Sequence, residues 1–143
     1  MPRLVSVIVR LPFLASAAWA DDKSSTDAAR AEIKAAFGGV PTFVDAIADP
    51  ALPGIWSEER NLILSKDTAL DSKTKALILL AISAQVPCMY CIYSDTLDAK
   101  RAGAPDKVIA EAVAVSGMAR NLSTILNGMQ VDFATYKAEM VGN

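Results

Sequence analysis

The chain has 143 residues, of which 52% are hydrophobic and 21% charged, a composition typical of a globular protein rather than a disordered one. Its formal net charge is −2, so it has no surplus of cations to neutralise phosphates, and we expect no nucleic acid partner. The chain contains no histidine, which excludes Ser/His and Cys/His catalysis and any metal site built from histidine.

The N-terminal residues predict an export signal. Arg3 and Arg10 lie in a short apolar stretch, and Ala18-Trp19-Ala20 matches the small-residue pattern of a cleavage site. The stretch is too short and interrupted to span a bilayer. The alternatives are a buried helix or a retained anchor. We expect residues 1–20 to be a signal peptide and residues 21–143 to be a single mature domain, periplasmic or secreted, that does not bind membranes.

Every long segment after the signal has the apolar spacing of a helix, and none alternates as a strand does. The sequence therefore predicts an all-α fold. Because the segment capped by Asp71-Ser72 has little polar face, we expect it to be central and buried on most sides. The predicted helices are 24–37 (stopped by Gly38-Gly39), 41–49, 51–65 (interrupted by Pro53-Gly54), 73–86, 88–102 (ended by Gly103), one that opens at 105–106, and 121–140.

Small side chains recur along the apolar helices, at Ala76, Ala81, Ala84, Ala112 and elsewhere. Small residues permit a close approach of helices, which tight packing within one chain would explain. A small domain with so many apolar helices also leaves a face to bury by self-association. We expect a homo-oligomer.

The motif whose side chains can react is Cys88-Met89-Tyr90-Cys91. Two cysteines three apart on a helix share one face, with Cβ atoms about 5–6 Å apart, close enough for a disulfide. Pro87 is favoured in a first helical turn, and the free N–H groups and positive dipole end would then lie beside the sulfurs and lower a thiol pKa. An oxidising compartment favours the disulfide. A disulfide that closes so short a loop adds little to the stability of the fold, which indicates that the pair serves a reaction instead.

Two plainer interpretations of the cysteines stay open. The bridge can be purely structural. A metal site has little support, because tetrahedral zinc requires four ligands and the chain offers two cysteines. Met89 is a possible ligand for copper(I), but on a helix it would point away from the cysteines, and we interpret it as a packing residue. We expect no metal and no cofactor.

The run Lys73-Thr74-Lys75-Ala76-Leu77-Ile78, the Cys88–Cys91 motif, Ala102-Gly103-Ala104 and the helix from Asp106 resemble the carboxymuconolactone decarboxylase superfamily, in its alkylhydroperoxidase (AhpD-like) branch. The resemblance implies an all-α fold with the cysteine pair heading a helix of a helical hairpin, and assembly into trimers or hexamers. It also implies that the dithiol reduces hydroperoxides, that the second cysteine (Cys91) attacks, and that a partner thiol or dihydrolipoyl protein restores the dithiol.

Two positions depart from the branch that the chain resembles. Its members usually have a glutamate where Ala76 stands and a histidine where Asp95 stands, and these two groups form their proton relay. Alanine can transfer no proton. Asp95, with an ordinary pKa of about 3.9, is a weak base that would also repel a Cys91 thiolate. Only burial and a raised pKa would suit it to be a base; otherwise we expect it to be solvated or paired with a cation.

Three hypotheses follow. The first is a weak thiol-dependent oxidoreductase that uses Cys88 and Cys91 on a small hydroperoxide or disulfide substrate, with an unidentified thiol reductant. The second is a non-catalytic helical oligomer or binding protein with a structural disulfide, which the missing relay favours. The third is a cofactor-free lyase of the decarboxylase type, which the absence of histidine disfavours.

Overall fold

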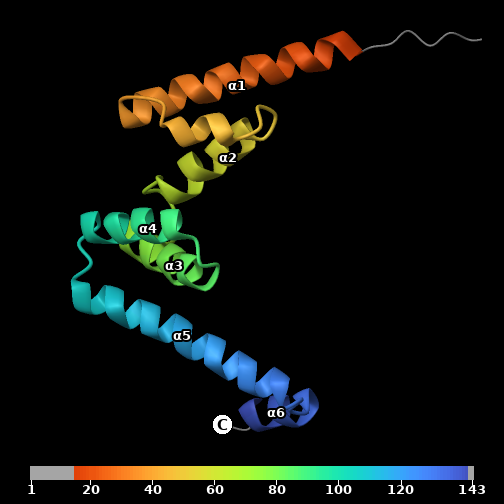
Figure 1. Cartoon of the computed structure of the whole chain (residues 1–143), viewed down its shortest axis with the longest axis vertical. Helices are drawn as coiled ribbons and strands as arrows, with labels where there is room; N and C mark the ends of the chain where they lie inside the picture. The colour runs from red at the N-terminus through yellow and green to blue at the C-terminus, as the bar shows by residue number, and fades with distance from the viewer. Residues whose placement is uncertain (1–14, 142–143) are drawn as a thin grey trace, which may run out of the picture. The chain divides into compact units, whose positions relative to one another are not determined.

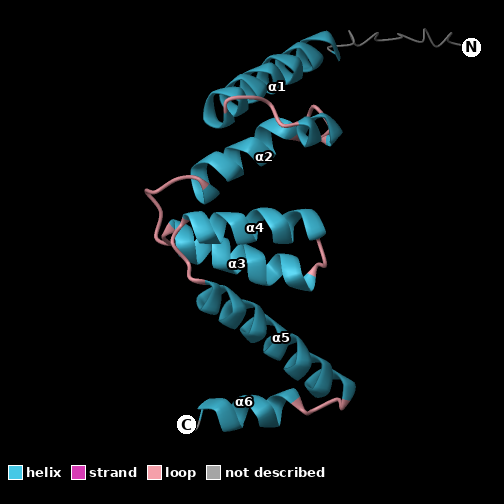
Figure 2. Ribbon diagram, turned by 60° about the vertical axis from the view of Figure 1, so that its left-hand side comes forward, coloured by secondary structure: helices cyan, strands magenta, loops and turns pink. Residues whose placement is uncertain are grey.

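A computed structural model of the chain describes the backbone of residues 15–141 and the side chains of residues 23–141. Within that range the chain is helical and has no strand, which confirms the predicted all-α fold (Figure 1, Figure 2). None of the described helices is both long and apolar enough to cross a bilayer. The elements are α1 (Ala15–Phe37), η1 (Thr42–Ala46), α2 (Leu52–Glu58), η2 (Glu59–Ile63), α3 (Ser72–Gln85), α4 (Met89–Arg101), α5 (Asp106–Gly128) and α6 (Phe133–Val141).

The chain divides into two compact units, Met1–Leu64 and Ser65–Asn143. The prediction of a single domain over residues 21–143 stays a prediction. Of the predicted signal peptide, residues 1–14 lie outside the described residues, and the rest forms the first turns of α1. α1 starts at Ala15 rather than at the predicted residue 24. A helix that runs through the predicted cleavage site neither supports nor contradicts cleavage, and the signal peptide stays a prediction.

The first unit buries one apolar cluster between α1, η1 and α2, formed by Ala29, Ile33, Val44, Leu52 and Trp56. The Thr26 hydroxyl holds α1 against the turn before α2, because it donates to the carbonyl oxygen of Asp49 at 2.8 Å. The predicted break at Pro53-Gly54 is wrong: Pro53 lies in the first turn of α2, where no backbone N–H is needed, so the helix continues through both residues.

The second unit is built on a hairpin in which α3 and α4 lie side by side (Figure 1, Figure 2). α3 begins as predicted, because the Asp71 carboxylate accepts the N–H of Thr74 at 2.8 Å. Alanines at Ala76, Ala99 and Ala104 form the buried cluster of the unit and let the helices approach closely. α5 packs on α3, where the Gln85 amide donates to the Ser116 hydroxyl at 3.2 Å.

Glycine ends α4 as predicted. Gly103 has φ +81°, its N–H donates to Lys100, and the N–H of Ala104 donates to Ala99. This pair of hydrogen bonds is the usual closure of a helix by a left-handed residue. It fixes the turn that leads from the hairpin into α5.

The prediction that the helix at 73–86 is buried on most sides is wrong for the single chain. Leu80 is only 2% exposed, but Ile82 is 54% exposed. α4 and α5 cover part of α3 and leave an apolar face open.

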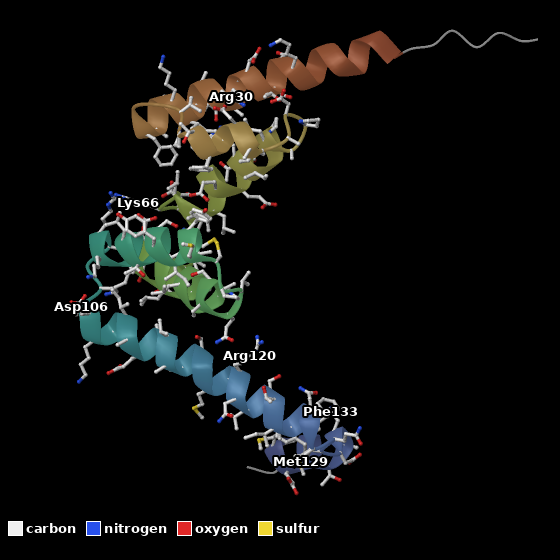
Figure 3. All side chains as sticks on the ribbon, in the orientation of Figure 1. Arg30, Lys66, Asp106, Arg120, Met129 and Phe133 are labelled. Atoms are coloured by element: carbon white, nitrogen blue, oxygen red, sulfur yellow. A yellow bond between two sulfur atoms is a disulfide. The ribbon has the colours of Figure 1, made fainter. Side chains whose placement is uncertain are left out.

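The prediction of one helix over residues 121–140 is also wrong. α5 runs on to Gly128 and then closes through Gln130, which has φ +52°. The N–H of Val131 donates to Leu126 at 3.0 Å across this closure. α6 starts anew because Asp132 accepts the N–H of Thr135 at 2.7 Å. Met129 and Phe133 mark the two sides of the break in Figure 3.

Candidate functional site: a disulfide at the start of α4

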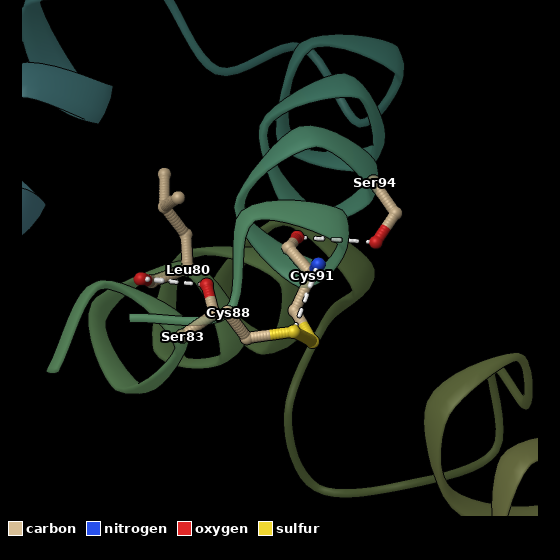
Figure 4. Close-up of a disulfide and its surroundings, with 5 residues drawn as sticks. All are labelled: Leu80, Ser83, Cys88, Cys91 and Ser94. Carbon is tan, nitrogen blue, oxygen red and sulfur yellow. Dashed lines mark hydrogen bonds between the residues drawn. A yellow bond between two sulfur atoms is a disulfide. The ribbon is translucent and has the colours of Figure 1, made fainter. Parts of the chain in front are cut away.

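Cys88 and Cys91 form a disulfide at the start of α4, with their Cα atoms 5.3 Å apart (Figure 4). Both residues are half-buried. The predicted disulfide spacing and the predicted helix are therefore confirmed, with α4 one residue shorter at each end than residues 88–102.

Cys88 is the N-cap residue of α4. Its backbone is extended (φ −90°, ψ 97°), and its Sγ accepts the N–H of Cys91 at 3.2 Å. Serine or aspartate oxygens usually fill this role. Pro87 precedes the N-cap and so lies outside the helix, which corrects its predicted place in the first turn. One free N–H group of the helix start, that of Cys91, is thus directed at the Cys88 sulfur.

Each cysteine has a hydrogen bond to its backbone. The N–H of Cys88 donates to the carbonyl oxygen of Ser83 on α3 at 3.1 Å. The Ser94 hydroxyl donates to the carbonyl oxygen of Cys91 at 3.1 Å (Figure 4). The first bond links Cys88 to α3, the second lies within α4, and the sulfurs lie where α3 turns into α4.

Asp95, one turn after Cys91, is half-buried rather than fully solvated, and no ion pair of the described residues includes it. Its carboxylate lies beside the hydroxyls of Ser83 and Ser94. Burial removes water from the carboxylate and raises its pKa above the ordinary value, the negative charge of Asp98 raises it further, and the two hydroxyls oppose the rise. This is the direction that a carboxylate base requires.

Ser83 is a member of this site that the sequence did not reveal. Its side chain is buried, and its hydroxyl donates to the carbonyl oxygen of Leu80 at 3.1 Å as well as contacting Asp95. The contact joins two helices, so no local spacing in the sequence marks it. An isolated serine in an apolar helix resembles the other small packing residues of that helix.

Ala76 offers no replacement for the expected glutamate. It is buried in the alanine cluster with Ala99 and Ala104. Beside it, the buried Lys75 directs its Nζ to the carbonyl oxygen of Ser65 at 2.8 Å. The position of the relay glutamate is therefore filled by close helix packing.

The surface beside the disulfide is apolar and aromatic. Tyr90 and Tyr93 are exposed, and Met89 is 68% exposed, so Met89 does not pack within the single chain as we had interpreted it. Among the described residues, no group of three or more histidine, cysteine, aspartate or glutamate side chains is arranged to hold a metal ion.

A sequence profile of the carboxymuconolactone decarboxylase family matches residues 50–131, a range that contains the disulfide, Ala76 and Asp95. The chain belongs to this family. Within the family it is 33% identical, over 85 residues, to the "Uncharacterized protein 4 in cox locus" of Paracoccus denitrificans. That match covers 57% of this chain and 77% of the relative.

The structure is similar to the crystal structure of the alkylhydroperoxidase AhpD core from Rhodospirillum rubrum, with a TM-score of 0.65 and 25% sequence identity. The similarity covers 87% of this chain and 93% of the AhpD core. The resemblance drawn from the sequence is therefore confirmed. This member of the carboxymuconolactone decarboxylase family has the AhpD-like helical fold, with its cysteine pair at the start of a helix.

Proposed function

We propose that the chain is a thiol-dependent oxidoreductase that reduces small hydroperoxides or exchanges disulfides through Cys88 and Cys91. The observation that carries the proposal is the hydrogen bond from the first turn of α4 to a cysteine sulfur within a Cys-x-x-Cys disulfide. Membership of the carboxymuconolactone decarboxylase family and the likeness to an AhpD core agree with it.

The reaction balances as a two-electron exchange. A thiolate attacks one peroxide oxygen, the O–O bond breaks, and the alkoxide leaves as an alcohol after protonation. The second thiol attacks the resulting sulfenic acid, an S–S bond forms, and water leaves. A thiol reductant of the dithiol class then restores both cysteines and is itself oxidised to a disulfide.

We expect the activity to be weak. Ala76 holds no proton, and among the described residues Asp95, one turn from Cys91, has a raised pKa that suits proton transfer. General acid–base catalysis typically contributes about 10²–10⁴-fold to a rate. Without the relay, the dithiol can still react with a hydroperoxide, but at a lower rate than with an intact relay.

The test uses the reduced chain, freed of reductant and mixed with tert-butyl hydroperoxide. Mass spectrometry after alkylation follows the loss of two alkylatable thiols as the disulfide returns. The control is the same reduced chain unfolded in urea, which keeps both thiols but loses the helix start. Faster oxidation of the folded chain supports the proposal, and equal rates contradict it.

A second candidate is the non-catalytic helical oligomer with a structural disulfide, favoured by the alanine cluster that replaces the relay. If the bridge is a structural element of the oligomer, the Cys88→Ser/Cys91→Ser variant should dissociate, and if the bridge acts in redox chemistry, the variant should keep its oligomeric mass. The free energy of unfolding should change little in either case, because so short a loop contributes little to it.

We also propose that the chain forms a homo-oligomer, a trimer or hexamer, through its exposed apolar helix faces. An open apolar hollow of about 290 Å³ lies between α3 and α5 and is lined by residues that include Leu77, Ile78 and Val115. Such faces are typical of surfaces that self-associate. Light scattering coupled to gel filtration should give three or six times the chain mass, and a monomer mass would contradict the proposal.

The location of the protein is a further proposal. We propose that residues 1–20 are removed on export and that the mature chain works in the periplasm or outside the cell, where disulfides form readily. N-terminal sequencing of the exported protein should begin at Asp21. A cytosolic chain that retains its first residues would contradict this.

A further inference from the structure

We propose that Cys88 is the attacking cysteine of this chain and that Cys91 resolves the intermediate, the reverse of the order that the family resemblance implies. The proposal rests on the proposed oxidoreductase function and assigns roles within the same dithiol. The structural basis is an asymmetry between the two sulfurs in their nearest charges and dipoles.

The first part of the asymmetry is the position of Cys88 at the N-cap. Its Sγ accepts the N–H of Cys91 at 3.2 Å, at the helix end where the N–H groups have no carbonyl partner within the helix. A thiolate there gains a hydrogen bond to its charged form and lies at the positive end of the helix dipole. Cys91 itself lies inside the first turn and supplies the donor.

The second part is the negative charge that follows Cys91. Asp95 lies four residues after Cys91, on the same face of α4 and one turn away, whereas it is seven residues from Cys88. An ionised Asp95 therefore disfavours a thiolate on Cys91 more than on Cys88. The nearby carboxylate of Asp98 is paired with Arg101 at 3.2 Å, so the difference between the two sulfurs rests on Asp95.

The other elements around the pair do not reverse this order. The last two turns of α3, residues 79–85, contain no ionisable side chain and present the Ser83 hydroxyl. α5 meets α3 at Ser116, and its charged groups nearest to that residue in sequence are Glu111 and Arg120, which have opposite signs and are exposed. Both effects that discriminate between the sulfurs thus favour Cys88.

The assigned step is balanced in the same way as the overall reaction. The Cys88 thiolate forms an S–O bond to the hydroperoxide as the O–O bond breaks, and an alcohol leaves. The Cys91 thiol then attacks the sulfur of the Cys88 sulfenic acid, its proton passes through solvent or Asp95 to the departing hydroxide, and water leaves as the S–S bond forms. With a disulfide substrate, Cys88 forms the mixed disulfide and Cys91 releases it.

The test compares the two single variants Cys88→Ser and Cys91→Ser, which keep one thiol each on the same scaffold. Each is reacted with an aromatic probe disulfide across a pH series, and with tert-butyl hydroperoxide in the presence of dimedone to trap sulfenic acid. At pH 7 the Cys91→Ser variant, which retains Cys88, should react with the probe disulfide about tenfold faster. It should also give the dimedone adduct.

A measurement on the unaltered chain covers the case in which a variant fails to fold. The reduced chain is treated with substoichiometric iodoacetamide at pH 7, and the modified peptides are separated by mass. Alkylation mainly at Cys88 supports the assignment. Alkylation mainly at Cys91, or a faster Cys88→Ser variant, overturns the assignment but leaves the oxidoreductase function standing.

Failure of the proposed function has a different signature. If both thiols react no faster than they do in the urea-unfolded chain, neither cysteine is activated, and both proposals fall together. As a matched test of the charge effect, Asp95→Asn should increase the reactivity of the Cys88→Ser variant several-fold. It should change the Cys91→Ser variant little. Equal changes in both would contradict the role given to Asp95.

Discussion

Restoring the family's glutamate at position 76 should destabilise the second unit rather than improve the chemistry. Ala76 is 6% exposed and packs against Ala99, which is fully buried, so the added atoms of a glutamate side chain have no space between α3 and α4. Overpacking a core typically costs about 1–3 kcal/mol. A carboxyl group without a partner adds about 1–3 kcal/mol. We expect Ala76→Glu to lower the free energy of unfolding by about 2–6 kcal/mol.

The assay is urea unfolding followed by far-UV circular dichroism at a fixed chain concentration, because association would otherwise shift the midpoint. Ala76→Gln is the matched control, since it has the same volume without the charge. Burial raises the pKa of a carboxyl group above its unfolded value. The glutamate variant should therefore match the glutamine variant at acid pH and become less stable than it as the pH rises. Wild-type stability in both variants, at every pH, would refute the close packing at Ala76.

Three further predictions concern the hairpin and its ends. Leu80→Ala should cost about 2–5 kcal/mol in urea unfolding, and Ile82→Ala, at a 54% exposed position, much less; equal losses would contradict the burial pattern. Gly103→Ala, at φ +81°, should cost about 1–2 kcal/mol in the same assay, whereas Gln130→Gly, at φ +52°, should stabilise the chain. Asp71→Asn should lower the thermal midpoint at pH 7 and match the wild type in acid. The N–H of Thr74 lowers the pKa of Asp71, so that stabilisation is present above the unfolded pKa and is lost as the pH falls through the folded value. A pH-independent difference would contradict the cap.

The sequence was informative wherever one local pattern decides the structure. The Asp71 cap, the glycine stop at Gly103 and the Cys-x-x-Cys at a helix start all depend on residues within one turn of each other, and the structure has all three. The α5–α6 boundary was missed because its closing residue is Gln130, which rarely takes a left-handed conformation and so gives no signal.

Contacts between helices account for what the sequence could not show at the site. The environment of Asp95 depends on Ser83, which is twelve positions earlier on the facing helix of the hairpin. The residues next to Asp95 in the sequence do not reveal whether its carboxylate is solvated or half-buried. The exposed face of α3 was mispredicted for a related reason, since apolar spacing shows that a face is to be covered but not by which chain.

The most direct test of the central claim is the reduction potential of the Cys88–Cys91 disulfide, measured by equilibrating the folded chain with dithiol redox buffers. A dithiol that exchanges with substrates and is restored by a thiol reductant must lie above the range of inert structural bridges. The account predicts a potential less negative than about −300 mV. A value far below that would make the disulfide a structural bridge and would contradict the oxidoreductase function.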